Sequence, residues 1–437
     1  MVFTLGQFSP MRSPAPQSPW PWVPSLYFAE GLPYALVASV SVVAYKNLGV
    51  SNDIVTLSAN LLCLPWMFKP LWSPVVDLIR TRRQWVWACQ MIMALSLLCL
   101  ALAVESSHFL ILSLVGMALL SLTSATHDMA ADGFYLVTLP EWQQAAFSGV
   151  RNTAYRAAGM AAQAGLVMMA GALYQHGGSY QSAWAIALGS CALIMFLLAS
   201  YHHFQLPYPS GDRPGSHAIG MPWLPDFLNV LGSFFRKRRI LIMLAFLLFY
   251  RFGEAQLAPV SRLFLLDAPD NGGLGLTDPQ YSRIYGLWGL AALLGGGLLG
   301  GWLISRHGLR RWLWPMVLAL HVPDGLFLWL ACAKPSSLLL ITLGVSVEQF
   351  GYGFGFAAYM MYMLHMARGR HSTAHYALCT GFMAAGLLIP GLWSGWLQLR
   401  LGYPLFFAWV LLATIPGFVV AACLSVPRNL GRRSPIR

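Results

Sequence analysis

Twelve long apolar stretches run through the chain and constrain its fold more than any other feature. A helix needs about 20 predominantly apolar residues to cross the hydrocarbon core of a bilayer. Only helices and closed barrels satisfy their backbone in lipid, and barrel strands alternate apolar with polar side chains. These stretches are uniformly apolar and predict an all-α integral membrane protein. They lie near residues 24–46, 54–79, 85–104, 109–137, 147–174, 183–205, 240–266, 281–305, 312–333, 337–366, 375–400 and 403–426.

The charged residues are too few for a water-soluble protein of this length. Of the 437 residues, 57% are hydrophobic and 10% are charged, whereas an average soluble domain carries about 25% charged residues. This composition excludes an ordinary soluble enzyme, a nucleic-acid-binding protein and a disordered protein. We therefore interpret the formal net charge of +12 as an asymmetry between the loops on the two sides of a bilayer.

The basic residues fall mainly on one side of the predicted membrane. With the N-terminus in the cytoplasm, 18 of the 27 Lys and Arg residues fall in cytoplasmic segments. The loop before the eighth stretch, on the other side, carries Asp267, Asp270 and Asp278. The positive-inside rule then predicts that both termini are cytoplasmic.

One polar stretch, at 206–239, divides the apolar stretches into six and six. It begins with several Pro and Gly residues and ends in four consecutive basic residues. We expect five segments: a disordered cytoplasmic N-terminal tail (1–22), an N-terminal six-helix bundle (23–205), a cytoplasmic linker (206–239), a C-terminal six-helix bundle (240–426) and a cytoplasmic C-terminal tail (427–437).

The two halves carry matching motifs. Glu30 in the first stretch aligns with Glu254 in the seventh at an offset of 224, and Asp77 after the second aligns with Ser305 after the eighth at an offset of 228. Parallel repeats of six helices, with a site at the midplane between them, are typical of major facilitator transporters. Basic residues follow Asp77 and Ser305, as in the cytoplasmic signature of that superfamily. Asp77 and its arginines form either a latch between helices or a simple anchor for topology.

Charges inside the apolar stretches are the candidates for a transport site. A charge at mid-bilayer costs at least ~2.5 kcal/mol, so each one needs a partner or a water-filled cavity. Arg251 and Glu254 are three residues apart and share a helix face, and Glu30 precedes Pro33, which interrupts helical hydrogen bonding. A static ion pair and a packing kink are the alternatives. The residues that we assign to a substrate and proton cavity are Glu30, Tyr34, Arg251, Glu254 and Glu348.

A second group of charges lies near the cytoplasmic end of the fourth and fifth stretches. Asp128 and Asp132 are one helical turn apart, and a short loop brings the basic residues of the next stretch close to them. We interpret this group as a gate or brace, although paired carboxylates would also suit a proton carrier. Asp324 is a weaker candidate, since the ninth stretch is peripheral in this architecture. The gate residues are Lys69, Asp77, Asp128, Asp132, Arg151 and Arg156.

Three motifs resemble the anhydromuropeptide permease (AmpG-type) branch of the major facilitator superfamily, which also includes siderophore permeases and acetyl-CoA transporters. They are Leu-Tyr-Phe-Ala-Glu-Gly-Leu-Pro-Tyr (26–34), Leu-Pro-Trp-Met-Phe-Lys-Pro-Leu-Trp-Ser-Pro-Val-Val-Asp (64–77) and Ser-Ala-Thr-His-Asp-Met-Ala-Ala-Asp-Gly (124–133). The resemblance implies twelve transmembrane helices in two six-helix bundles related by a pseudo-two-fold axis.

For function, the resemblance implies proton-coupled import of anhydromuropeptides, N-acetylglucosaminyl-anhydro-N-acetylmuramic acid with or without its peptide, across the bacterial inner membrane. It implies a monomer in the lipid bilayer, with a small-molecule substrate and protons as partners and with no cofactor, metal or nucleic acid. The first basic loop departs from the usual pattern by losing its glycine, which leaves the substrate open. A ferric siderophore or acetyl-CoA is the alternative within this class, and a polytopic membrane transferase is the alternative outside it.

Overall fold

The computed structural model describes residues 18–51, 54–55, 58, 61–213 and 223–433. Within these residues the secondary structure is helical and contains no strand, which confirms the expected all-α fold. The helices of the N-terminal half are α1 (Val23–Ala35), η1 (Leu36–Val40), α2 (Ser41–Asn47), α4 (Leu64–Phe68), η2 (Lys69–Leu71), α5 (Ser73–Ile79), α6 (Arg82–Ala103), α7 (Phe109–Thr138), α8 (Glu141–Met160), η3 (Ala161–Leu166), α9 (Val167–Gln175) and α10 (Tyr180–Gln205).

The second half begins after a helix that lies inside the expected linker, α11 (Trp223–Phe235). Its helices are α12 (Ile240–Phe249), α13 (Phe252–Leu266), η4 (Pro269–Asn271), α14 (Asp278–Tyr281), η5 (Ser282–Gly289), α15 (Leu290–His307), α16 (Leu309–His321), η6 (Val322–Asp324), α17 (Gly325–Ala333), α18 (Leu338–Ala367), α19 (Ser372–Ala413) and α20 (Ile415–Cys423).

Ten of the described helical segments are long and apolar enough to cross a bilayer. The last of them, Ser372–Cys423, corresponds to two expected spans, because Gly402 adopts a non-helical conformation (φ 71°, ψ 167°) within α19. The second expected span is described only in part and is broken into short helices that begin at or near Pro65, Pro70 and Pro74. Twelve spans in two six-helix bundles account for the whole pattern.

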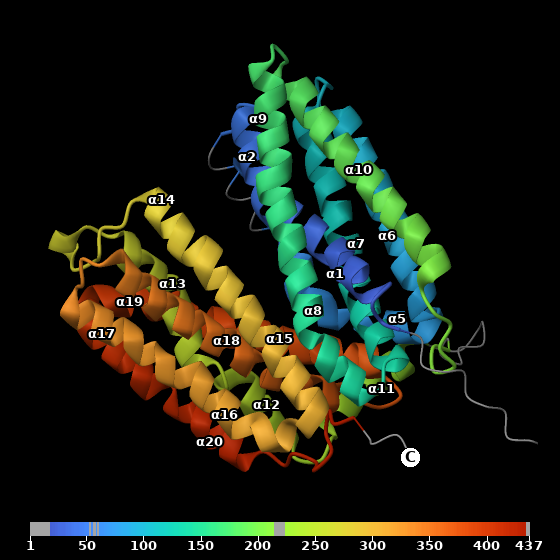
Figure 1. Ribbon diagram of the computed structural model, residues 1–437. Coiled ribbons are helices and arrows are strands. Elements are labelled where there is room, and N and C mark those ends of the chain that lie inside the picture. Colours follow the sequence, from blue (N-terminus) through green and yellow to red (C-terminus); the bar gives the residue numbers. More distant parts are fainter. Residues whose placement is uncertain (1–17, 52–53, 56–57, 59–60, 214–222, 434–437) are drawn as a thin grey trace, which may run out of the picture.

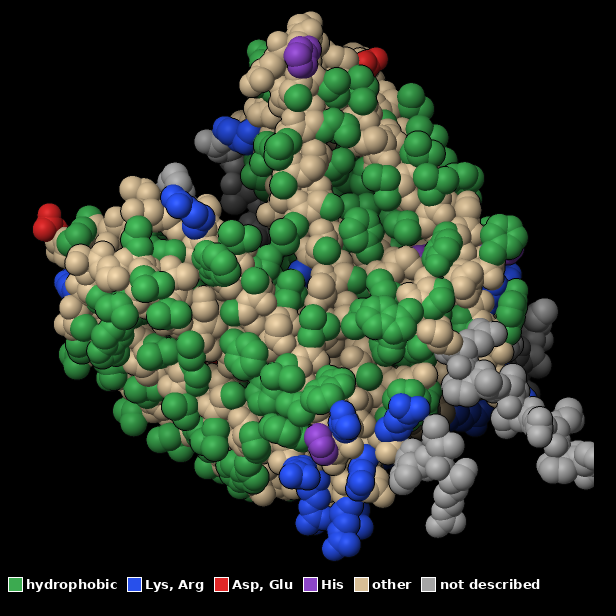
Figure 2. Space-filling model, viewed as in Figure 1, with side chains coloured by type: hydrophobic (Ala, Val, Ile, Leu, Met, Phe, Trp, Pro, Cys, Tyr) green, Lys and Arg blue, Asp and Glu red, His purple; other side chains and the backbone are tan. Residues whose placement is uncertain are grey.

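The two bundles meet at one end and diverge at the other. Figure 1 shows them converging near α5 and α11 and spreading apart towards α9 and α14. Lys and Arg side chains gather at the converging end in Figure 2, and the space between the bundles is visibly hollowed at the other end. We call these the basic end, which carries the loops at 80–83, 236–239 and 306–311, and the open end.

Close contact between the bundles depends on glycine. Helices α8 and α15 come from different halves and pack against each other near the basic end. A Cβ atom on Gly149 of α8 would lie 2.6 Å from the Cα of Leu298 on α15, and one on Gly301 of α15 would lie 2.7 Å from the Ser148 hydroxyl. Small residues at such positions let helix backbones approach closely in membranes.

The segment before α1 is more ordered than its composition predicted. We expected a disordered tail at 1–22, of which 1–17 lies outside the described residues. Residues 18–22 form a turn in which Trp22 is buried against Phe134, with ring centroids 5.4 Å apart. Trp20 contacts Phe147 in the same way, at 5.0 Å. The expected tail does not describe these five residues, because Trp22 is 2% exposed and buries apolar surface that the Pro-rich composition obscured, although Trp20 stays 64% exposed.

Candidate functional site

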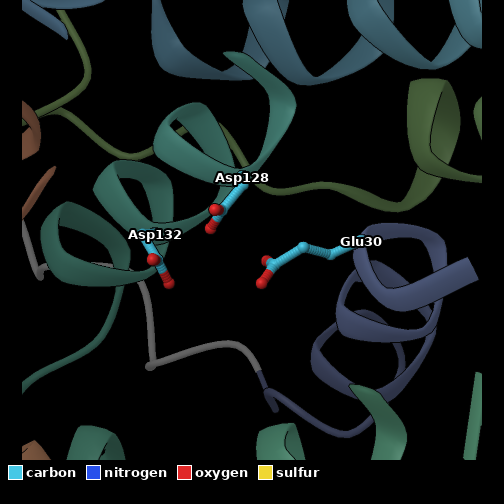
Figure 3. A group of neighbouring side chains, drawn as sticks. All are labelled: Glu30, Asp128 and Asp132. Carbon is cyan, nitrogen blue, oxygen red and sulfur yellow. The ribbon is translucent and has the colours of Figure 1, made fainter. Parts of the chain in front are cut away.

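Three carboxylates converge in the N-terminal bundle. Glu30 comes from α1, and Asp128 and Asp132 come from successive turns of α7. In Figure 3 the three side chains point towards one another across the space between these helices. One oxygen atom from each lies within 4.8 Å of the others, and all three residues are largely buried. The structure therefore joins Glu30, which the sequence suggested for a cavity, to the two acids suggested for a gate.

Two basic side chains compensate this N-terminal acid cluster. The Lys69 ammonium group forms an ion pair with Asp128, and the Arg151 guanidinium group forms one with Asp132. The Tyr27 hydroxyl group donates a further hydrogen bond of 2.9 Å to Asp132. One carboxylate oxygen of Glu30 has no partner in the described structure. Three acids therefore share two cations, so protonation of one acid would leave the cluster electrically neutral.

A second acid cluster occupies the C-terminal bundle. Glu254 from α13, Asp324 from η6 and Glu348 from α18 also place carboxylate oxygens within 4.8 Å of one another. Their residues are 4%, 1% and 2% exposed, respectively. The expectation that Asp324 is peripheral is not supported by this geometry. A turn of 3-10 helix at Val322–Asp324 interrupts the ninth span, and Asp324 lies on it among the inward acids.

Among the described residues, no Lys or Arg side chain forms an ion pair with the C-terminal acid cluster. Within the described residues, Glu348 accepts a hydrogen bond of 2.9 Å from the Gln349 amide, whereas one oxygen of Glu254 and both oxygens of Asp324 have no partner. Arg251, which we expected to pair with Glu254, instead donates to the Tyr352 hydroxyl group. Its guanidinium carbon lies 4.9 Å from the centroid of the Tyr352 ring. The two halves thus repeat the acids but, among the described residues, not their ion pairs.

Irregular backbone surrounds the two pseudo-symmetric glutamates. After Pro33, helix α1 continues into a π-helical turn at Leu36–Val40. The seventh span breaks at Arg251, whose φ of −116° and ψ of 23° separate α12 from α13 just before Glu254. Interrupted helices expose backbone groups at the sites of many secondary transporters. The local sequence accounts for the first irregularity, since proline cannot donate its backbone hydrogen bond.

A cavity of about 380 Å³ is lined by Gly31, the residue after Glu30 in the N-terminal acid cluster. Its wall is built mainly from α1 and α8, and Leu290 at the start of α15 completes it from the other half. Tyr34 is 37% exposed here, and its ring lies 5.0 Å from that of Trp66. Arg156, which the sequence analysis assigns to the gate, lines this cavity and has a buried Nε without a partner in the described structure. The volume lies in the range of small-molecule sites.

Bonds between the two halves close the basic end. Asp77 accepts a hydrogen bond of 2.5 Å from the Arg82 guanidinium group. It accepts a second one, of 2.9 Å, from the backbone N–H of Ala374, in the first turn of α19. Arg82 also donates a hydrogen bond of 2.7 Å to the Thr373 hydroxyl group. Asp77 therefore joins the second span to the eleventh, in the other bundle. This is the geometry that a latch requires, because separating the bundles at this end would break these bonds.

Two further elements of the closed end were not found from the sequence. Asp212, in the linker, accepts hydrogen bonds of 2.8 and 3.0 Å from the backbone N–H groups of Arg82 and Arg83. Leu430, in the segment after α20, is buried. The backbone N–H of the next residue, Gly431, donates a hydrogen bond of 3.3 Å to the carboxylate of Glu141 in the other half. Asp212 lies 130 residues from Arg82, and Gly431 lies 290 residues from Glu141. No local pattern connects positions this far apart.

Comparisons with known proteins agree with this architecture. A family model described as the Major Facilitator Superfamily matches residues 25–374. The putative transporter AmpG 4 of Rickettsia conorii is 24% identical over 93% of this chain and 96% of its own length. The anhydromuropeptide permease of Escherichia coli K12 is 24% identical over 90% of this chain and 77% of its own.

Solved structures show the same fold. The transporter FucP in its outward conformation covers 93% of this chain and 98% of its own with a TM-score of 0.69 at 14% identity. The match to the proton:xylose symporter XylE covers 94% of this chain and 95% of that chain, with a TM-score of 0.60 at 12% identity. The expected resemblance to AmpG-type permeases is confirmed, and the relatives are transporters and permeases rather than enzymes. This chain belongs to the Major Facilitator Superfamily and is a multi-pass membrane transporter of small molecules.

Proposed function

We propose that the protein is a monomeric, proton-coupled importer of anhydromuropeptides in the bacterial inner membrane. Two observations carry the proposal together: a buried acid cluster in each half, and a cavity lined by Tyr34, Tyr155 and Arg156. The similarity to the anhydromuropeptide permease of Escherichia coli supports this choice of substrate. The basic end faces the cytoplasm, as the positive-inside rule requires.

In this orientation the structure corresponds to an outward-open state. The inter-half bonds of Asp77, Arg82 and Glu141 close the cytoplasmic side, and the bundles diverge on the outer side (Figure 1). Transport then requires these bonds to break while the outer side closes around the substrate. Rocking of one bundle against the other about a fixed central site is the general mode of such repeats.

The acid clusters supply groups for proton coupling. Carboxylates this close repel each other when all are ionised, so a shared proton stabilises the cluster. In the N-terminal cluster, protonation would weaken the hold of Lys69 and Arg151 on their partners, and Arg151 also lies within 5.8 Å of the Tyr376 ring in the other half. Protonation can therefore change contacts across the interface between the bundles.

The cavity matches the chemistry of a sugar that carries an acid group. Aromatic faces such as those of Tyr34 and Tyr155 stack on pyranose rings, and their centroids are 6.2 Å apart in the cavity wall. Arg156 offers a guanidinium group to a carboxylate, which arginine binds with two parallel hydrogen bonds. Muramic acid and its peptide both carry carboxylates. Another organic anion would satisfy Arg156 but would not use the aromatic wall in the same way.

Uptake into proteoliposomes under an imposed proton gradient tests this proposal. Labelled anhydromuropeptide, a ferric siderophore and acetyl-CoA are compared side by side, and we expect gradient-dependent accumulation of the muropeptide alone. Accumulation of either other compound in its place would refute the substrate assignment.

Coupling is tested with Glu30→Gln and Glu254→Gln. Both should abolish proton-driven accumulation without reducing the amount of inserted protein. Glu105→Gln is the matched control, because Glu105 is exposed in the loop after α6 and belongs to neither cluster. Full accumulation by both cluster variants, or equal uptake with and without the gradient, would contradict proton coupling.

A further inference from the structure

A separate cavity of about 290 Å³ lies at the basic end of the C-terminal bundle. It is bounded by the start of α12, the last turns of α18 and the segment that follows α20. Its polar lining consists of Arg238, Arg239, Tyr362, His365 and Ser425. The proposed substrate cavity shares none of these residues, so the two cavities are separate sites.

The positive charge of this pocket is not compensated by the protein. Arg238 and Arg239 are both exposed, and neither forms an ion pair with a carboxylate in the part of the chain that the structure describes. The lining contains no Asp or Glu. One nitrogen of His365, Nδ1, is buried without a hydrogen-bond partner among the described residues. Two arginines without a carboxylate among the lining residues suit an anion.

The fold holds the two arginines at this position. The Lys237 ammonium group donates to the backbone carbonyl groups of Met366 and Arg368, where α18 ends. These contacts fasten the linker to α18 and cover carbonyl oxygens that would otherwise repel an anion. Arg239 itself adopts a left-handed conformation, with φ 63° and ψ 31°, which is disfavoured for a residue with a Cβ atom.

The pocket also lies at the start of a candidate membrane span, Ile240–Leu266. Helix α12 enters the apolar region at Ile240, immediately after the two arginines. Ile242 and Met243, one turn further along, form the apolar side of the same cavity. A ligand here would place a polar head on the arginines and apolar chains along α12. Basic pockets between transmembrane helices at the cytoplasmic side bind anionic lipid head groups elsewhere.

We propose that this pocket binds a phosphate group, carried by an anionic phospholipid or present as free phosphate. Arginine forms paired hydrogen bonds with phosphate oxygens, and the hydroxyl groups of Tyr362 and Ser425 add further donors. The bound phosphate would connect the linker, α18 and α20 at the end of the molecule that must open during transport. This inference does not depend on the identity of the transported substrate.

The test uses the purified full-length protein. Retention of phosphatidylglycerol against phosphatidylcholine is measured by native mass spectrometry, and the thermal midpoint is measured with and without inorganic phosphate in lipid-free detergent. The main variant is Arg238→Gln with Arg239→Gln. Its matched control is Arg306→Gln with Arg311→Gln, which removes the same charge from the same end but outside the pocket. Ser425→Trp is a third variant, which fills the pocket at an exposed position without changing its charge.

We expect the main variant to bind phosphatidylglycerol about tenfold more weakly or worse, from the contribution of each arginine near a charged surface. Ser425→Trp should reduce retention as well, and the control should not. A phosphate-dependent rise of the thermal midpoint, lost in the main variant, would identify free phosphate as a ligand; retention without such a rise would identify the lipid. Equal behaviour of the wild type and both pocket variants in both measurements would overturn the proposal, as would an equal loss in the control.

Discussion

The bond between Asp77 and the first turn of α19 should set the balance between the two transport states. Asp77→Asn keeps the shape of the side chain but removes its charge. The carboxylate accepts hydrogen bonds of 2.9 Å from the Ala374 N–H and 2.5 Å from Arg82. It is buried against the N-terminus of α19, which belongs to the other bundle. Both the charge-assisted hydrogen bond and the helix dipole favour the ionised acid there.

The size of the effect follows from these two contributions. A hydrogen bond to a charged group is worth about 1.5–3 kcal/mol and a neutral one about 1 kcal/mol. A charge at a helix N-terminus adds about 0.3–2 kcal/mol. We therefore expect Asp77→Asn to destabilise the closed basic end by about 1–3 kcal/mol, which changes the ratio of the two states about 5- to 150-fold.

Spin labels at the open end would measure this ratio. Cysteines replacing His176, after α9, and Asp270, in η4, lie in exposed positions on opposite bundles. The seven native cysteines must first be replaced. In a pulsed dipolar measurement, Asp77→Asn should increase the population with the shorter distance, because the open end closes as the basic end opens.

Asp212→Asn is the matched control for this experiment. Asp212 also binds the start of α6, through the backbone N–H groups of Arg82 and Arg83 and an ion pair of 3.5 Å with the Arg82 guanidinium group, but it makes no described bond of its own to the other bundle. It should leave the distance distribution unchanged. An unchanged distribution with Asp77→Asn, or an equal change with Asp212→Asn, would refute the latch.

Three further predictions concern packing, buried charge and the cavity. Asp132→Asn leaves Arg151 without its buried partner and should lower the free energy of unfolding by about 3–5 kcal/mol in thermal or denaturant unfolding. Asp324→Asn removes a carboxylate that has no hydrogen-bond partner among the described residues and should not lower it, so equal losses would contradict the asymmetry between the clusters. Gly149→Leu overfills the interface between α8 and α15, which should destabilise it by about 1–3 kcal/mol. It should increase the population with the shorter spin-label distance, as Asp77→Asn does, and wild-type distances would argue against tight packing there. Arg156→Gln should weaken muropeptide binding by about tenfold or more in calorimetry, as expected for a lost charge-assisted hydrogen bond; unchanged affinity would remove Arg156 from the site.

Several of the site residues could be recognised from the sequence because the bilayer makes them exceptional. Glu30 and Glu254 stand out as charges within apolar stretches, and their spacing repeats between the halves. The same reasoning misplaced Asp324 and Arg156. Which way a side chain faces depends on where its helix bends and on which neighbour covers it, and a short 3-10 turn directed Asp324 inwards.

The sequence by itself determined the membrane location, the number of spans and the two-fold repeat, since each depends on the length and spacing of apolar segments against a bilayer of fixed thickness. The tertiary structure alone decided how the charges combine. It placed ion pairs on one acid cluster and, among the described residues, none on the other, and it joined Asp77 to Ala374 across 297 residues. Such pairings depend on the packing of two separate bundles, and local sequence carries no record of the distance between them.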